Sequence, residues 1–200
     1  VGGEDSLFQA KITNLGYADA GPFWLDMSID GEYSYSWNFP GGLPARNYSE
    51  RSVTLTGGLF AGTHYIQFTV DATEVVSESN EGNNTRTVTF TWTGTPDLEV
   101  TNIYNPTSVI SGENTTITAR ITNVGYANAG PFWVDMYIDG QYTVSWDFYI
   151  GLQVRDSGEV SFPIPGGLPA GTHSFRFVAD SLNEVAESDE SNNERTGSWT

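Results

Sequence analysis

The chain has 200 residues, with 25 acidic residues against 8 Lys and Arg, no cysteine, and an aromatic content of 14%. Its formal net charge of −17 opposes binding to nucleic acid and to anionic lipid, because both of these are negatively charged themselves. Disulfides are excluded, and no apolar run is long enough to cross a bilayer, so we expect no membrane-spanning segment.

The chain contains one stretch twice, at 12–31 and at 121–140. The copies read ITNLGYADAGPFWLDMSIDG and ITNVGYANAGPFWVDMYIDG, so each residue of the first repeat corresponds to the residue 109 positions later. This correspondence continues to the C-terminus without a gap. A fixed period of this length indicates one folding unit written twice, and we expect two domains, at residues 1–94 and 95–200.

The elements expected in each repeat are short strands. The first covers Ser6 to Asn14, and the second begins at Phe23, where apolar and polar side chains alternate as in a half-buried strand. Asp30-Gly31 favours a tight hairpin turn, because the turn needs positive φ values. A last strand is expected at Thr85 to Trp92, after a Gly-rich turn and a further apolar strand.

About seven short strands per repeat, without helical periodicity, predict an all-β fold. We expect two tandem immunoglobulin-like β-sandwich domains, each of about seven antiparallel strands. A further strand is expected at Pro96 to Tyr104, before repeat two, and repeat one has no counterpart to it. The first domain is therefore expected to lack its opening strand, either because the chain is a fragment of a longer array or because the strand comes from elsewhere.

Four motifs occur in both repeats: Thr-Asn-x-Gly-x-Ala-x-Ala-Gly-Pro-Phe, Ile-Asp-Gly, Ala-Gly-Thr-His and Val-x-Glu-Ser-x-Glu-x-Asn-Asn. Together with Pro-Asp-Leu-x-Val at Pro96 to Val100, they resemble the CARDB domain, the cell adhesion related domain found in bacteria. The resemblance covers nearly the whole chain, twice. It implies an immunoglobulin-like fold and an extracellular or cell-surface location in a prokaryote, but no single biochemical activity.

The loop before the last strand of each repeat is rich in carboxylates and amides. Calcium is bound by carboxylate, amide and backbone oxygens, so calcium is the one cofactor that this loop suggests. The alternative is structural, since the same side chains commonly hydrogen-bond the backbone of a long loop. The residues concerned are Asp71, Glu78, Glu81, Asn83 and Asn84 in repeat one, and Asp180, Glu187, Glu190, Asn192 and Asn193 in repeat two.

Trp24 and Trp133 alternate with the inward residues of their strands, so we expect both on an outer sheet face. An indole there can stack against a sugar or a neighbouring subunit, or it can be covered by loops of its own domain. Asn47, Asn83 and Asn114 begin Asn-x-Ser/Thr triplets and are candidate N-glycosylation sites.

No catalytic arrangement is found in either repeat. The two histidines, His64 and His173, occupy the same turn, and no serine nucleophile motif lies near them. We therefore expect a noncatalytic extracellular structural or adhesion module, a spacer or subunit of a surface or secreted fibre that assembles by strand donation to the open edge of domain one. Its expected partners are other proteins, copies of itself or a glycan. The alternative function is a carbohydrate-binding accessory module of a secreted enzyme.

Overall fold

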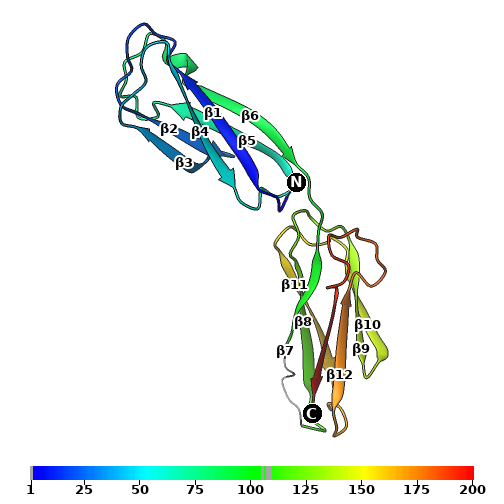
Figure 1. Ribbon diagram of the computed structural model, residues 1–200. Coiled ribbons are helices and arrows are strands. Elements are labelled where there is room, and N and C mark those ends of the chain that lie inside the picture. The colour runs from blue at the N-terminus through cyan, green and yellow to red at the C-terminus, as the bar shows by residue number, and fades with distance from the viewer. Residues whose placement is uncertain (1, 105, 107–109) are drawn as a thin grey trace. The chain divides into compact units, whose positions relative to one another are not determined.

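The computed structural model describes residues 2–104, 106 and 110–200 (Figure 1). The regular elements within these residues are thirteen β-strands and one short 3-10 helix. The chain divides into two compact units, unit 1 at Gly3–Trp92 and unit 2 at Thr93–Thr200. None of the described helical residues forms a segment long and apolar enough to span a membrane.

Unit 1 contains two antiparallel sheets. One sheet pairs β1 with β4, and the other has the strand order β3-β2-β5-β6. A 3-10 helix, η1 (Glu81–Asn83), lies just before β6. The strand bounds are β1 (Ser6–Thr13), β2 (Phe23–Ile29), β3 (Glu32–Phe39), β4 (Tyr48–Leu55), β5 (Gly62–Val70) and β6 (Thr85–Trp92).

Unit 2 repeats this arrangement with one strand more. Its four-stranded sheet has the order β10-β9-β12-β13, and its other sheet has three strands in the order β11-β8-β7. The strand bounds are β7 (Leu98–Tyr104), β8 (Thr115–Asn123), β9 (Phe132–Ile138), β10 (Gln141–Phe148), β11 (Ser157–Ile164), β12 (His173–Ala179) and β13 (Glu194–Trp199). These sheets confirm the predicted fold of two tandem immunoglobulin-like sandwiches.

The repeated stretch folds as its alternation of apolar and polar residues predicts. Phe23, Leu25 and Met27 are buried between the sheets, and so are their counterparts in β9. Asp30 and Gly31 have φ values of 52° and 86°, so the turn from β2 to β3 uses the left-handed region that favours glycine.

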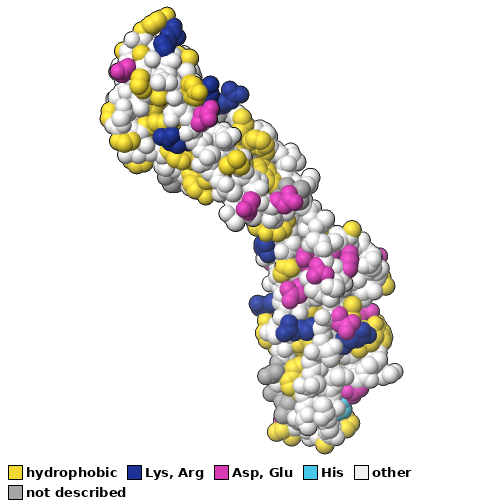
Figure 2. Space-filling model, in the orientation of Figure 1, with side chains coloured by type: hydrophobic (Ala, Val, Ile, Leu, Met, Phe, Trp, Pro, Cys, Tyr) yellow, Lys and Arg dark blue, Asp and Glu magenta, His cyan; other side chains and the backbone are white. Residues whose placement is uncertain are grey.

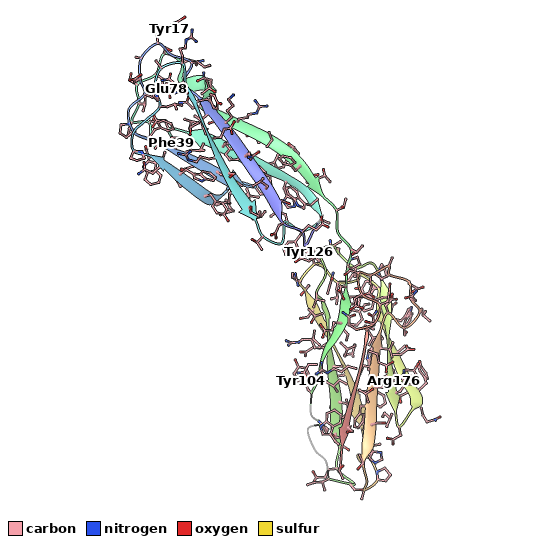
Figure 3. The ribbon with its side chains drawn as sticks, viewed as in Figure 1. Tyr17, Phe39, Glu78, Tyr104, Tyr126 and Arg176 are labelled. Atoms are coloured by element: carbon pink, nitrogen blue, oxygen red, sulfur yellow. The ribbon has the colours of Figure 1, made fainter. Side chains whose placement is uncertain are left out.

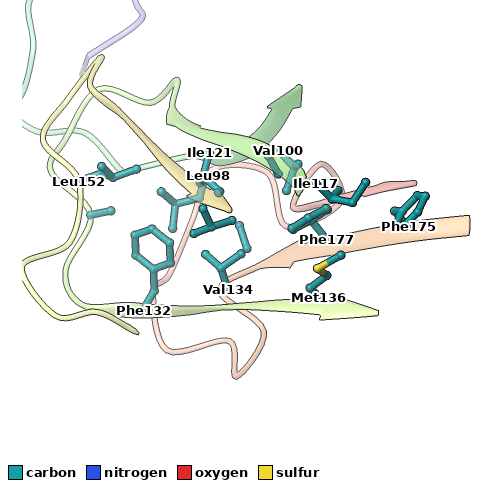
Figure 4. Close-up of a cluster of buried hydrophobic side chains, with 14 of the residues drawn as sticks. Leu98, Val100, Ile117, Ile121, Phe132, Val134, Met136, Leu152, Phe175 and Phe177 are labelled. Atoms are coloured by element: carbon teal, nitrogen blue, oxygen red, sulfur yellow. The ribbon is translucent and has the colours of Figure 1, made fainter. Parts of the chain in front are cut away.

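The core of unit 2 is one cluster built from both sheets (Figure 4). Strand β7 contributes Leu98 and Val100, which are 0% and 1% exposed. The core of unit 1 is divided into two smaller clusters, one around Leu25 and the other around Met27. The additional strand therefore joins the core of unit 2 into a single body.

Strand β1 of unit 1 is paired on one side only within the described part of the chain. The residues that β7 covers in unit 2 are correspondingly less buried in unit 1. Phe177 is buried whereas Phe68 is only half-buried, and Val185 is buried whereas Val76 is not. The prediction that the first domain lacks its opening strand is confirmed for the described residues, in which one edge of β1 has no neighbouring strand.

Candidate strand-binding site

The acidic loop of each unit begins with a buried aspartate that holds the loop's own backbone. Asp71 accepts hydrogen bonds from the N–H groups of Val75 (3.1 Å) and Val76 (2.8 Å). Asp180 accepts the corresponding bonds from Glu184 (2.9 Å) and Val185 (2.8 Å). These carboxylates therefore shape the turn that precedes the rest of the loop.

The second half of the loop is also held by its own side chains. Glu190 accepts from the Glu187 N–H at 2.9 Å, and Glu187 Oε1 accepts from Asn193 Nδ2 at 2.6 Å. In unit 1, Glu81 accepts from the Glu78 N–H at 2.8 Å. The repeated spacing of glutamate and asparagine thus fixes the position of Glu187 or Glu78 at the edge of the loop.

In unit 2 this loop holds the opening strand. Glu187 Oε2 accepts a hydrogen bond from the Leu98 N–H, at the first residue of β7. The Ser188 N–H donates to the Pro96 carbonyl at 2.9 Å. Asn192 Nδ2 donates to Asp97 Oδ1 at 2.7 Å. Backbone and side chain of the incoming segment are therefore both bound by the loop.

A buried asparagine holds the same segment from the other side. Asn123 Oδ1 accepts from the N–H groups of Asp97 (3.2 Å) and Gly125 (3.1 Å). Its Nδ2 donates to the carbonyls of Ala127 (2.8 Å) and Leu152 (3.2 Å). Because Asn123 is fully buried, each of these bonds replaces a bond to water that burial removes.

Gly125 allows the segment to pass close to the backbone of unit 2. A Cβ at this position would lie 2.6 Å from the Asp97 nitrogen, the Pro96 carbonyl carbon and the Thr95 oxygen. A side-chain carbon does not come so close to a backbone atom to which it is not bonded. Only glycine is compatible with the docked strand at this position.

Unit 1 carries the same set of side chains without the strand. Asn14 still binds the Gly16 N–H and two carbonyls, and Glu78 Oε1 still accepts from Asn84 at 3.0 Å. Figure 3 shows Glu78 at the same end of unit 1 as Tyr17, and Glu78 is exposed whereas Glu187 is half-buried. In Figure 2, hydrophobic side chains reach the surface over much of the visible face of unit 1.

Of the predicted loop residues, Glu187 and Asn192 contact the opening segment of unit 2, and Asn193 and Asn84 bind the glutamate of their own loop. Asp71, Asp180, Glu81 and Glu190 bind loop backbone, and Asn83 lies exposed in η1. In the described residues, no group of three or more His, Cys, Asp and Glu side chains is placed to hold a metal ion.

The Glu187 carboxyl should make unit 2 less stable as the pH rises. Partial burial, with the charges of Glu190 and Asp180, raises its pKa from 4.5 to about 7, although the bonds from Leu98 and Asn193 oppose the rise. Between these values the folded state keeps a proton that the unfolded state has lost. We therefore expect the unfolding free energy of unit 2 to fall by about 1–2 kcal/mol as the pH rises from 4.5 to 7.

Denaturant titrations at several pH values, followed by a signal from unit 2, measure how its unfolding free energy changes with pH. Glu187→Gln should flatten it, because an amide has no proton to lose in this range. An unchanged slope in the variant would assign the effect to other groups.

At the other end of each unit, a histidine joins the hairpin turn to the Gly-rich turn. His173 Nδ1 lies 2.7 Å from Asp139 Oδ2, and its Nε2 lies 2.8 Å from the Pro169 carbonyl. Both partners are acceptors, so the ring satisfies both only when it carries two protons. His64 has the same arrangement with Asp30 and the Phe60 carbonyl.

We expect His173 to be charged at pH values where a free histidine is neutral. The hydrogen bond to Asp139, and then that to Pro169, raise the pKa of His173 above 6.5. The stabilisation is complete below the pKa of the unfolded state and is lost as the pH rises through the higher folded pKa. Ring nitrogen chemical shifts measured against pH test this, and a midpoint below 6.5 would contradict it.

Trp24 and Trp133 lie where the alternation places them. They are 40% and 36% exposed, on the outer face of the four-stranded sheet of each unit. The three sequon asparagines, Asn47, Asn83 and Asn114, are all exposed.

A cleft of about 270 Å³ at the end of unit 2 is lined by Ile117, His173 and Trp199, among others. In unit 1 the corresponding space holds Trp92, which packs against Phe8 at 6.0 Å between ring centroids. We assign no substrate to this cleft.

Sequence reasoning found the loop but not the asparagine and glycine opposite it. Asn14, Asn123, Gly16 and Gly125 are all part of the repeated Thr-Asn-x-Gly motif. The recurrence of the motif in both repeats was the signal that could have indicated a role for these residues. The role itself depends on contact with the segment before β7, which lies elsewhere in the sequence.

The fold defines the chain as a pair of immunoglobulin-like modules. The CARDB family profile matches residues 1–88 and 95–197, so the chain belongs to the CARDB family. CARDB domains are adhesion-related modules of bacteria and are a noncatalytic type of domain. A search of curated proteins gives no match.

Two solved structures of one CARDB domain are similar to this chain. The crystal structure of the CARDB domain of the PF1109 protein from Pyrococcus furiosus, in complex with di-metal ions, is 24% identical, with a TM-score of 0.48, and the match covers 53% of this chain and 93% of that one. The solution structure of that domain is 20% identical, with a TM-score of 0.45, and covers 54% and 94%. Fibronectin(III)-like modules of Clostridium thermocellum CbhA are 14% identical, with a TM-score of 0.28, and cover 98% and 83%.

Proposed function

We propose that this chain is a noncatalytic structural and adhesion module at the surface of a prokaryotic cell or in a secreted fibre. In this proposal it serves as a spacer or subunit, and unit 1 is completed by a strand added to the free edge of β1. The observation that carries the proposal is that β1 pairs with β4 alone among the described strands, because an edge strand presents backbone groups that another chain can pair with.

The direction of the backbone groups supports the same proposal. The Asn14 N–H donates to the Asn47 carbonyl at 2.9 Å, on the side of β4. Successive N–H groups in a strand point to opposite edges, so those of Thr13, Lys11 and Gln9 point toward the other edge of β1. Among the described residues of unit 1, no strand pairs with this edge.

Hydrogen exchange tests the added strand. In the purified chain we expect the amides of Gln9, Lys11 and Thr13 to exchange fast, and in surface or secreted material from the producing cells we expect them to exchange slowly. Lys11→Pro removes one outward N–H and keeps the pairing with β4, so it should prevent incorporation into that material. Fast exchange in both samples would refute strand addition, and absence of the chain from surface and medium would refute the location.

Carbohydrate binding is the second candidate function. The exposed indoles of Trp24 and Trp133 are what favours it, because an aromatic ring on a sheet can stack on a sugar. A glycan array probed with the chain and with the double variant Trp24→Ala, Trp133→Ala tests this function. Signals lost in the double variant would support it, and an array without signals would remove it.

Calcium binding is a separate proposal for the acidic loop. Burial, and after it the charges of Glu190 and Asp180, raise the pKa of Glu187, and a bound cation would relieve the charge repulsion. Calorimetric titration with calcium chloride tests it, with Glu187→Gln as the comparison. No heat and no rise in melting temperature at millimolar calcium would remove the proposal.

A further inference from the structure

We propose that the outer face of β9 and β10 in unit 2 binds a neutral polysaccharide. Its sugar rings stack on Trp133 and Tyr142, and its hydroxyl groups donate hydrogen bonds to Asp135 and Asp147. This inference rests on carbohydrate binding, the second candidate function, and it adds the unit, the residues and the charge of the ligand. Asp147 lies directly opposite Trp133, so the two side chains share one face of the sheet.

A bulge in β10 turns Tyr142 to the same outer face. Tyr142 is paired with Tyr137 of β9, and the register shifts between Tyr142 and Val144. Without the extra residue, Tyr142 would point inward with Val144, which packs against the core, because side chains alternate along a strand. Tyr142 is instead 60% exposed. The bulge therefore adds a second exposed ring to the face that carries Trp133.

Hydrogen bonds hold the Tyr142 ring in position. Ser145 Oγ donates to the Asp135 carboxylate, which only accepts. The hydroxyl of Tyr142, 3.0 Å from Ser145 Oγ, is therefore the donor in the bond between them. The Tyr142 ring also meets the Tyr137 ring edge to face, with 5.9 Å between the centroids. A ring that is already ordered loses little conformational entropy when a sugar stacks on it.

The polar groups between and beside the two rings require a ligand that brings donors. Asp147 is exposed, and no donor within the described residues binds its carboxylate. Asp135 Oδ2 accepts only a long bond, with 3.5 Å to the Tyr137 hydroxyl. Both carboxylates therefore keep free lone pairs, which the hydroxyl groups of a sugar can use.

The charge of this face opposes anionic ligands. Arg176 of β12 lies on the same face and is labelled in Figure 3, but its Nη1 is 2.8 Å from Glu194 Oε2 and its guanidinium stacks on Tyr137 at 3.9 Å. Asp135 and Asp147 are thus left without a cation. An anionic polysaccharide, or the same face of a second copy, would be repelled. A neutral sugar carries donors without this repulsion.

Unit 1 has the exposed indole but not the groups around it. The counterparts of Tyr137, Asp147 and Arg176 are Ser28, Asn38 and Gln67, in that order. Ser28 provides no ring to support a neighbouring tyrosine, and Asn38 carries no charge. Gln67 Nε2 donates to Thr87 Oγ1 at 3.1 Å within its own sheet. We therefore assign the ligand to unit 2 and none to Trp24.

Titration of the full chain with cellohexaose, mannohexaose and xylohexaose tests the inference, with polygalacturonate as the anionic comparison. We expect a neutral oligosaccharide to bind at one site per chain and polygalacturonate not to bind. Trp133→Ala and Tyr142→Ala should each weaken binding by about 10-fold or more. Trp24→Ala, the matched change in unit 1, should leave the affinity unchanged. In the unsubstituted chain, amide signals of 133–147 should shift and those of 24–38 should not, which locates the ligand without any variant.

The outcomes separate this inference from the function on which it rests. A glycan array without signals would refute both together. Binding that Trp24→Ala abolishes and Trp133→Ala leaves intact would keep carbohydrate binding and overturn the assignment to unit 2. Equal binding of polygalacturonate would show that the class of sugar is wrong. If polylysine binds this face, salt releases it and no neutral sugar competes, the occupant is a cationic polypeptide and the polysaccharide is refuted.

Discussion

Gly125→Ala is expected to destabilise unit 2 by about 3 kcal/mol or more, although it adds a single carbon atom. The new Cβ would lie 2.6 Å from three backbone atoms of residues 95–97. Backbone atoms in a paired strand cannot move aside as a side-chain tip does, so the segment before β7 must lift. Lifting it breaks the bonds to Asn123 and Glu187 and begins to expose Leu98.

Gly16→Ala is the matched control, since it makes the same change at the same place in unit 1. There the nearest atom is Asn14 Oδ1 at 3.1 Å, which a small side-chain adjustment relieves. We expect this variant to destabilise unit 1 by less than about 1 kcal/mol. Hydrogen exchange followed separately in 6–55 and 115–164 compares the two units. Equal losses in the two variants would show that the docked strand is not what requires glycine at Gly125.

The sequence predicts the sandwich well because the signals for it are local. Alternation places Phe23, Leu25 and Met27 in the core, and Asp30-Gly31 forms the expected turn. The absence of an opening strand in unit 1 is also visible, because the repeat provides its own comparison. These features depend on residues near one another in the chain, and periodicity reports them directly.

The strand-holding role of the loop is not visible in the sequence, because its partners are distant. Glu187 binds the N–H of Leu98, a residue 89 positions earlier. A run of carboxylates and amides is compatible both with a metal site and with backbone hydrogen bonds, and no local pattern separates the two. The fold brings one end of β7 against this loop, and this contact joins residues that lie far apart in the sequence. The same reason hides the role of Asn123, whose acceptor oxygen binds Asp97.

Leu98→Ala is expected to lower the unfolding free energy of unit 2 by about 2–5 kcal/mol. Leu98 is fully buried in the cluster that both sheets share, so the truncation removes apolar contacts and leaves a cavity in that cluster. Leu98 is the first of the two buried apolar residues of β7, so the strand should open from this end. Denaturant unfolding with exchange in 115–164 measures the change.

Leu182→Ala is the control in the same unit. Because Leu182 is 61% exposed, this substitution should lower the unfolding free energy by less than about 0.5 kcal/mol. A second readout distinguishes a loosened strand from a general loss of packing. If β7 opens first, the amides of Arg120 and Thr122, which face β7, lose protection before those of Ala119 and Ile121, which face β11. Unit 2 with β7 released would then expose the same edge that unit 1 presents. Simultaneous loss at all four amides would mean that β7 and the rest of the sandwich unfold as one body.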